Sequence, residues 1–269
     1  MDVANKVIVV TGGGSGIGRA LVLALIAKGA RVAAVDLNET TLKETAALAG
    51  PNKEKISLHV LNITDRKAVE ALPQAVIDAH GAVDGLINNA GIIQPFVRFN
   101  DLDYSAIERV LNVNLYGVIY MTKTFLPHLL KRPSSHIVNV SSMGGFFPVP
   151  GQSLYGASKA AVKLLTEGLS SELTETNTRV TVVFPGAIAT NISQNSGVNI
   201  SAPSSDGGKA RSFPTTAPER AAEVIINGME RNHFQVFIGR DSNMMNLLYR
   251  LSPKRATRFM FNQMKSLLG

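Results

Sequence analysis

The sequence contains no cysteine and no tryptophan. Without cysteine, disulfide bonds, thiol nucleophiles, thiolate zinc sites and iron–sulfur clusters are excluded, and we expect no metal site. Long apolar runs are also missing. The longest one near the start, Leu21 to Ala27, is far too short to span a bilayer. The first ten residues lack the features of a secretory signal. We therefore expect a cytoplasmic protein, with attachment to a membrane surface left open below.

Acidic residues are scarce in one part of the chain only. The 269 residues carry a formal charge of +7, and residues 231–269 hold seven of the 27 basic residues and one of the 20 acidic ones. Six of the positive charges therefore belong to this tail. A nucleic-acid-binding protein usually spreads its basic residues over a groove or recognition element, so we predict no nucleic-acid partner.

Short β-branched runs alternate with segments of helical length. Several of the runs, such as Val7–Val10 and Arg31–Val35, are nearly all apolar, which is typical of parallel strands covered on both faces. The expected strands are Lys6–Thr11, Arg31–Asp36, Ile56–Asn62, Val83–Asn88, His136–Ser141, Arg179–Phe184 and Gln235–Ile238. The clearest expected helices are Gly16–Lys28, Arg66–His80, Ser105–Leu130 and Ser153–Thr174. This alternation predicts an α/β fold with a doubly wound parallel sheet.

We expect one catalytic domain over residues 1–240, followed by an extension of the same domain over residues 241–269. Residues 190–216 interrupt the pattern with many Ser, Asn, Gly and Pro residues. Long loops in compact domains are usually functional or disordered. This segment is thus either a substrate loop that covers a pocket or a plain surface insertion.

A glycine-rich turn, Thr11 to Gly18, lies between the first strand and the first helix. Glycine lets the backbone turn sharply and approach a ligand closely, and the helix N-terminus offers free N–H groups to a pyrophosphate. The second strand ends at Asp36, whose carboxylate can accept hydrogen bonds from ribose hydroxyls and would repel a 2′-phosphate. The motif predicts NAD rather than NADP, although Asp36 could instead be a helix cap.

Tyr155 and Lys159 are four residues apart, so they share one face of a helix. An ammonium group about 5 Å from the phenol would stabilise the phenolate by about 3 kcal/mol, which would make Tyr155 an acid or base near neutral pH. Such a pair could also be an ordinary surface pair. Ser142 favours the catalytic alternative, because it follows a strand that ends at the expected ligand crevice. Thr190 could bind the cofactor carboxamide, Asn62 the adenine amino group, and Asn114 is an unfavourable choice inside a helix.

The motifs TGGGSGIG, NNAG and YGASK, with Asn114, Ser142 and PGAIAT, resemble in order and spacing those of the short-chain dehydrogenase/reductase family, over about residues 5–240. The resemblance implies a Rossmann-type seven-stranded sheet in the order 3-2-1-4-5-6-7. It also implies hydride transfer between a nicotinamide and an alcohol or carbonyl. By this resemblance Tyr155 is the acid/base, and Lys159 lowers the Tyr155 pKa and holds the nicotinamide ribose. Ser142 orients the substrate, and Asn114 completes a proton relay. Family members often form tetramers or dimers, so we expect a homo-oligomer.

Together, the motifs and the resemblance define the expected cofactor site. The residues are Gly12, Gly14, Ser15, Gly16, Ile17, Gly18, Asp36, Leu37, Asn62, Ile63, Asn89, Ala90, Gly91, Tyr155, Lys159, Pro185, Gly186, Ile188 and Thr190. Asn62 departs from the aspartate that is usual at its position.

The residues around the expected site are apolar and include no cluster of Arg or Lys, so we predict a lipophilic secondary alcohol or ketone as substrate. It could be steroid-like, long-chain or small. The expected substrate contacts are Gln94, Ser142, Gly144, Phe147, Gln152 and Asn191. Alternatively, Phe146–Val149 simply packs the core or a subunit interface. Two functional alternatives also remain: an NADPH-dependent carbonyl reductase and a non-catalytic NAD-sensing module.

The tail combines apolar residues with five interleaved basic residues and predicts two amphipathic helices that are broken near Ser252-Pro253. Three roles are open for it. The helices could cover the pocket mouth or a neighbouring subunit, they could bind anionic lipid as a peripheral membrane contact, or they could be a solvated extension.

Overall fold

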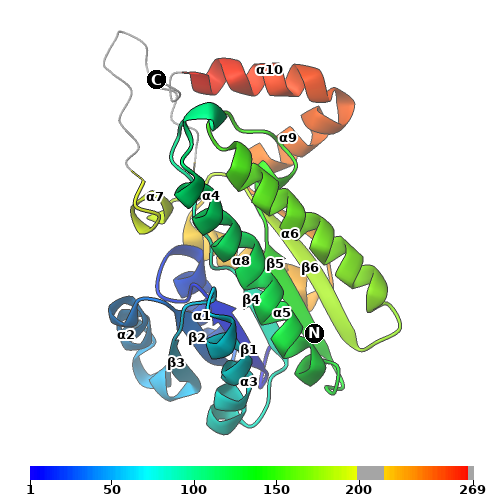
Figure 1. The fold of residues 1–269 in the computed structure, drawn as a ribbon. Helices are drawn as coiled ribbons and strands as arrows, with labels where there is room; N and C mark the ends of the chain where they lie inside the picture. Colours follow the sequence, from blue (N-terminus) through cyan, green and yellow to red (C-terminus); the bar gives the residue numbers. More distant parts are fainter. Residues whose placement is uncertain (199–214, 266–269) are drawn as a thin grey trace.

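A seven-stranded, fully parallel sheet forms the centre of the protein (Figure 1). The computed structural model describes residues 1–198 and 215–265, so most of the expected substrate loop, residues 199–214, lies outside the described residues. The strand order is β3-β2-β1-β4-β5-β6-β7, which confirms the doubly wound architecture. The strands are β1 Val7–Thr11, β2 Arg31–Asp36, β3 Ile56–Val60, β4 Gly85–Asn88, β5 Ser135–Val140, β6 Thr178–Pro185 and β7 Gln235–Ile238.

The alternation of side chains along β1 explains why helices cover both faces of the sheet. Ile8 and Val10 belong to one apolar core, together with α1 and α8, whereas Val7 and Val9 belong to a second core with α3 and α5. All four side chains are fully buried. The helices are α1 Gly16–Ala27, α2 Glu39–Leu48, α3 Arg66–His80, α4 Tyr104–Leu111, α5 Gly117–Leu129, α6 Ser153–Glu172, α7 Ile192–Asn195, α8 Pro218–Glu230, α9 Arg240–Leu251 and α10 Pro253–Met264.

Local chemistry sets the ends of these helices. Asp65 precedes α3, and its side chain accepts hydrogen bonds from the Lys67 and Ala68 amides. Gly81 ends the same helix with a left-handed φ of 83°. The helix expected over Ser105–Leu130 is α4 and α5 joined by a π-helical turn, Asn112–Tyr116. Helix α2 was not among the clearest expected helices, and Asn38 caps it by accepting a hydrogen bond from the Thr41 amide.

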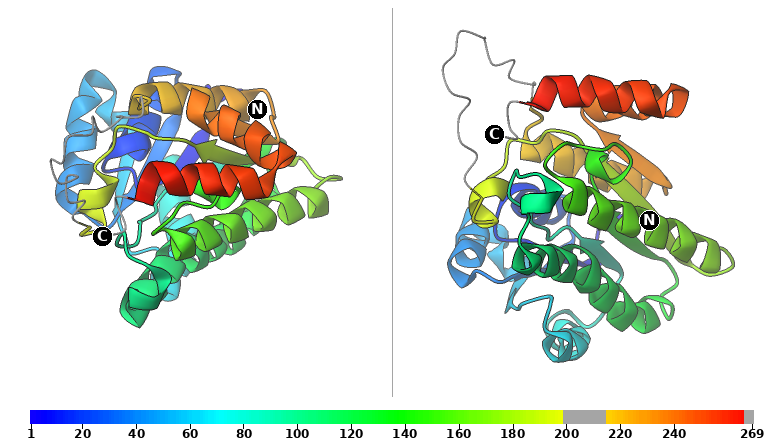
Figure 2. Two further views of the ribbon diagram at one scale, coloured as in Figure 1. Left: turned by 90° about the horizontal axis from the view of Figure 1, so that it is seen from above. Right: turned by 45° about the horizontal axis from the view of Figure 1, so that its top comes forward.

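The tail forms the two helices that its sequence predicts, with the break at Ser252. Figure 2 shows α9 and α10 as an outer hairpin, with α10 crossing one end of the molecule. A small third core joins this hairpin to the domain through Phe147, Met245, Ala256 and Met260. Across the described residues, no helix combines the length and the apolar character that crossing a membrane requires.

Candidate active site

A cavity of about 740 Å³ opens where the carboxyl ends of β1, β2, β4, β5 and β6 converge. The strand order reverses direction between β1 and β4, and ligands of doubly wound sheets bind at such a point. All of the predicted cofactor residues line this cavity except Gly14 and Gly18.

Those two glycines shape the turn from behind. A Cβ on Gly18 would collide with the Gly12 carbonyl, so only glycine lets the helix pack this closely on the turn. The Gly14 amide donates a hydrogen bond of 2.9 Å to Asp36 Oδ2. Gly12 and Gly16 have positive φ values of 70° and 50°. The turn therefore aims the N-terminus of α1, which has no acidic residue in its first turn, at the cavity.

Asp36 lies at the end of β2 on the cavity wall. Its second oxygen, Oδ1, accepts a hydrogen bond from the Asn38 amide at 3.0 Å, so the carboxylate is fixed on both sides. Arg19 is the first cation after the glycine turn, but its guanidinium has other partners: its Nη2 pairs with Glu44 Oε2 at 2.7 Å and its Nε donates to the Gly14 carbonyl. In the described part of the chain, Lys159 is the one Lys or Arg on the cavity wall.

Thr11 is a positioning residue that the sequence motifs did not single out. Its hydroxyl oxygen accepts hydrogen bonds from the Asn89 and Ala90 amides, each at 3.0 Å. Its carbonyl accepts one from Asn89 Nδ2. Thr11 thereby ties the turn after β4 to the end of β1, which keeps both turns open toward the cavity.

Asn62 reaches the cavity but already has partners. Its Oδ1 accepts hydrogen bonds from the Thr64 amide and hydroxyl, at 3.0 and 2.9 Å. An adenine amino group would compete with these two donors for the same oxygen, so the predicted contact through Oδ1 has little support here.

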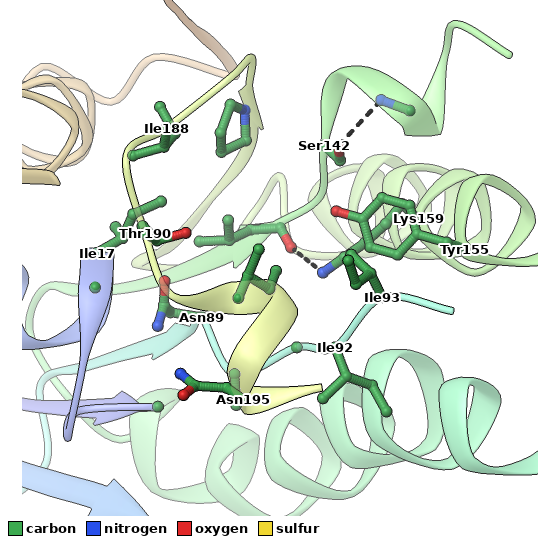
Figure 3. Close-up of a pocket in the computed structure, with 18 of the residues that line it drawn as sticks. Ile17, Asn89, Ile92, Ile93, Ser142, Tyr155, Lys159, Ile188, Thr190 and Asn195 are labelled. Atoms are coloured by element: carbon green, nitrogen blue, oxygen red, sulfur yellow. Dashed lines mark hydrogen bonds between the residues drawn. The ribbon is translucent and has the colours of Figure 1, made fainter. Parts of the chain in front are cut away.

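The predicted catalytic side chains meet on one wall of the cavity. Tyr155 and Lys159 come from the first turns of α6, and Ser142 follows β5, and Figure 3 shows the three facing the same space. Lys159 Nζ donates a hydrogen bond of 3.0 Å to the Val140 carbonyl. Ser142 Oγ accepts one of 3.0 Å from the Gly144 amide, so its own proton is available to Tyr155 or to a substrate oxygen in the cavity.

Burial determines the protonation of this pair. It lowers the pKa of the Lys159 ammonium to about 8. It also raises the pKa of the Tyr155 phenol, and a hydrogen bond with Ser142 opposes that rise. The pKa of Tyr155 therefore lies above its ordinary value, opposite to the expected lowering by Lys159, because burial disfavours the phenolate. At neutral pH Tyr155 is a protonated phenol beside a mostly charged amine.

Asn114 is fully buried within the π-helical turn, a type of turn that often marks functional sites. Its Oδ1 accepts a hydrogen bond from the Ile92 amide, and its Nδ2 donates to the Ile92 carbonyl and to Ser158 Oγ. Ser158 in turn bonds the Tyr155 carbonyl at 2.7 Å. A Cβ on Gly91 would lie 3.1 Å from Lys159 Nζ and 3.3 Å from Asn114 Oδ1, so both side chains flank Gly91. Asn114 thus links α5 to the catalytic helix.

Of the predicted substrate contacts, Ser142, Gly144 and Gln152 line the cavity, and the other three do not. Gln94 is completely buried, and its Oε1 caps α6 by accepting hydrogen bonds from the Leu154 and Tyr155 amides. Phe147 is buried against Tyr249 at a ring distance of 5.8 Å, as the packing alternative expected. Asn191 is exposed and lines a second cavity, which shares Gly16 and Thr190 with the first.

Most of the remaining cavity lining is apolar, although Ser193, Asn195 and Asp241 also belong to it. The tail helices contribute three thioethers, and the segments after β4 and β5 contribute further aliphatic and aromatic side chains. These residues are Ile92, Ile93, Phe96, Met143, Val149, Ile192, Met245, Met260 and Met264. The position of the tail methionines agrees with one of the three roles left open for the tail, in which its helices cover the pocket mouth. The spacing of the methionines alone does not show which end of the sheet the tail covers.

Comparison with known proteins agrees with this arrangement. Residues 6–200 match the family model of the short chain dehydrogenases. A protein of Mycobacterium tuberculosis named as an oxidoreductase, SadH, is 36% identical over 257 residues, which are 92% of this chain and 91% of that protein.

Two solved structures share the fold. A short chain dehydrogenase/reductase from Burkholderia phymatum in complex with NAD is 24% identical with a TM-score of 0.84, over 94% of this chain and 96% of that one. A short chain dehydrogenase from Burkholderia cenocepacia in complex with NADP is 26% identical with a TM-score of 0.80, over 97% and 99%. The chain therefore belongs to the short-chain dehydrogenase family of oxidoreductases.

Proposed function

We propose that this protein transfers a hydride between NAD(H) and a lipophilic secondary alcohol or ketone. The observation that carries the proposal is a single cavity in which a glycine turn and Asp36 lie at one end and Ser142, Tyr155 and Lys159 at the other. The residues fit a dinucleotide, since side chains at Gly16 or Gly18 would fill the cradle or collide with the turn.

Preference for NAD rests on the surroundings of Asp36. A 2′-phosphate would bring about 1.5 to 2 negative charges next to this carboxylate. The cation that could offset them, Arg19, is engaged by Glu44 and the Gly14 carbonyl and does not line the cavity. The hydroxyls of an unphosphorylated ribose would instead donate hydrogen bonds to the carboxylate.

When bound, the nicotinamide supplies the hydride acceptor for alcohol oxidation and the donor for the reverse reaction. In the reductive direction the Tyr155 phenol gives its proton to the carbonyl oxygen. The Ser142 hydroxyl donates a hydrogen bond to the same oxygen and stabilises the negative charge that develops there. Lys159 would bind the ribose hydroxyls and, as a cation, favours the phenolate that Tyr155 becomes. In the oxidative direction the phenolate takes the proton of the alcohol.

The character of the substrate follows from the part of the cavity lining outside the predicted cofactor residues. Most of these side chains are aliphatic, aromatic or thioether groups, and thioethers adapt to irregular apolar shapes. In the described residues, no arginine or lysine besides Lys159 lines the cavity to hold a carboxylate or phosphate of a substrate. An extended or ring-shaped apolar ketone suits this wall best.

A substrate panel tests the proposal. NADH oxidation is followed with decan-2-one, a 3-ketosteroid, cyclohexanone, pyruvate and a ketose, in wild type and in Tyr155→Phe. We expect turnover with the apolar ketones only, and at least a thousandfold loss of kcat in Tyr155→Phe with NADH affinity within threefold of wild type. Best turnover on pyruvate or the ketose would refute the lipophilic substrate. Substantial activity of Tyr155→Phe would refute the assigned acid.

A further inference from the structure

The C-terminal helical hairpin, α9 and α10, presents two different faces. Its inner face closes the substrate end of the cavity with Met245, Met260 and Met264 and packs on Phe147. Among the described residues, none outside the hairpin covers its exposed outer side chains, and Figure 2 shows α10 crossing the outside of the molecule. The same hairpin therefore lines an apolar pocket on one side and forms part of the exposed surface on the other.

The outer face of α9 is apolar. Met244, Leu247, Leu248 and Leu251 are spaced at i, i+3, i+4 and i+7, so they form one stripe along the helix. Their exposed fractions are 50%, 60%, 38% and 74%. Helix α10 adds two half-exposed phenylalanines, Phe259 and Phe261. Phe259 and Phe261 are two residues apart and so point about 200° apart around α10, which leaves the α9 stripe as the continuous apolar part of the surface. An exposed apolar stripe indicates a surface that binds something apolar.

The same hairpin is strongly basic. Six basic side chains between residues 240 and 265 are exposed, namely Arg240, Arg250, Lys254, Arg255, Arg258 and Lys265. None of them forms a salt bridge within the described parts of the chain. The single acid of this segment, Asp241, turns inward and accepts a hydrogen bond of 2.7 Å from the Ala187 amide. The outer face therefore carries positive charge without compensation.

We propose that this hairpin docks the protein on an anionic lipid surface. The leucine stripe enters the boundary between head groups and acyl chains, while the arginines and lysines bind the lipid phosphates. Long basic side chains can keep their charge at the head groups while their stems cover apolar surface. Because the opposite side of the same hairpin lines the cavity, docking would bring the pocket next to the phase in which lipophilic alcohols and ketones dissolve.

The positive charge of the hairpin's outer face favours lipid over the other partners that could bind there. A symmetric contact with a second copy would set two sets of six positive charges against each other. A nucleic acid would match the charge but would leave the leucine stripe in water. An anionic membrane surface satisfies both features at once.

Vesicle binding of the full-length protein tests the inference without cofactor or substrate, so its outcome is independent of the proposed function. The probes are vesicles of phosphatidylcholine alone and vesicles with about one third phosphatidylserine. We expect co-sedimentation with the anionic vesicles, and weaker binding as salt rises. Removal of one basic side chain near the surface should lower the partition coefficient about fivefold. Arg255→Glu/Arg258→Glu should therefore lower it at least 25-fold.

Matched variants separate the two parts of the surface. Lys53→Glu/Lys67→Glu makes the same change in net charge at exposed positions away from the hairpin, and it should bind like wild type. Leu247→Gln/Leu251→Gln keeps the charge and should lower partitioning about tenfold. Circular dichroism and melting temperature check that each variant is folded.

Several outcomes would overturn the inference. Equal binding to neutral and anionic vesicles, or no binding to either, would contradict it. If the hairpin charge variant and the control charge variant lose vesicle binding equally, the effect comes from the net charge of the protein and not from the hairpin. The wild-type protein could fail to bind vesicles while the hairpin variants change the oligomeric state in sedimentation velocity. In that case the outer face of the hairpin is a contact between two copies of the protein instead.

Discussion

Replacement of Asp36 by asparagine tests the cofactor preference and removes little else. The substitution keeps one side-chain oxygen, so a hydrogen bond from either the Gly14 or the Asn38 amide can persist. It removes a negative charge from the cavity wall. With a carboxylate and a 2′-phosphate about 5 Å apart and an effective dielectric between 20 and 80, their repulsion lies between about 1 and 5 kcal/mol. We take about 3 kcal/mol, which is roughly a hundredfold change in affinity.

The opposite effect is expected for NAD. A hydrogen bond from a ribose hydroxyl to a charged acceptor contributes about 1.5 to 3 kcal/mol, and the neutral amide keeps part of this. We expect kcat/KM for NADPH to rise about a hundredfold and kcat/KM for NADH to fall about tenfold, measured with one fixed ketone. Glu39→Gln, which removes an exposed charge that is paired with Lys43 on α2, should leave both unchanged. Unaltered preference in Asp36→Asn, or an equal shift in Glu39→Gln, would refute the role of Asp36.

Three further predictions follow from the site. Burial lowers the pKa of Lys159 to about 8, so its positive charge is present below that pH and is lost above it. As the pH rises, kcat/KM for NADH should therefore fall with an apparent pKa of about 8. A kcat/KM that stays constant up to pH 9.5 would contradict this. Gln94→Leu leaves the amides of Leu154 and Tyr155 without their acceptor, so we expect a loss of about 1 to 3 kcal/mol in urea unfolding and a reduced kcat. A loss of stability with unchanged kcat would show that Gln94 does not position Tyr155. Phe147→Ala opens a cavity beneath the tail hairpin. We therefore expect faster proteolysis of residues 240–265 and a KM for an apolar ketone at least fivefold higher. An unchanged KM would show that the hairpin is not part of the substrate site.

The fold was accessible from the sequence because hydrophobic alternation and turn residues act locally. The strands β2 and β7 have the expected bounds, and the others differ from expectation by one or two residues at one or both ends. The strand order came from the family resemblance, and the structure confirms it. The π-helical turn at Asn112–Tyr116 was not foreseen, since a register change inside a helix leaves the apolar periodicity nearly intact.

The cofactor end of the site was also largely predictable, because glycine turns and strand-end carboxylates follow local backbone geometry. The substrate end was not. Gln94 and Phe147 lie close in sequence to cavity residues, yet their side chains turn into the interior, and sequence distance does not show that direction. Met260 and Met264 reach the cavity only through the tertiary placement of the tail. The sign of the Tyr155 pKa shift depended on burial, which the spacing of Tyr155 and Lys159 does not reveal.

Transfer of isotope from cofactor to product tests the central claim most directly. The wild-type protein and Tyr155→Phe are incubated with an apolar ketone and NADH in which both hydrogens at the nicotinamide C4 are deuterium. The alcohol is analysed by mass spectrometry. The account predicts one deuterium at the carbinol carbon with wild type and no labelled alcohol with Tyr155→Phe, although that variant still binds NADH. Alcohol without the label, or equal labelling by both proteins, would contradict it.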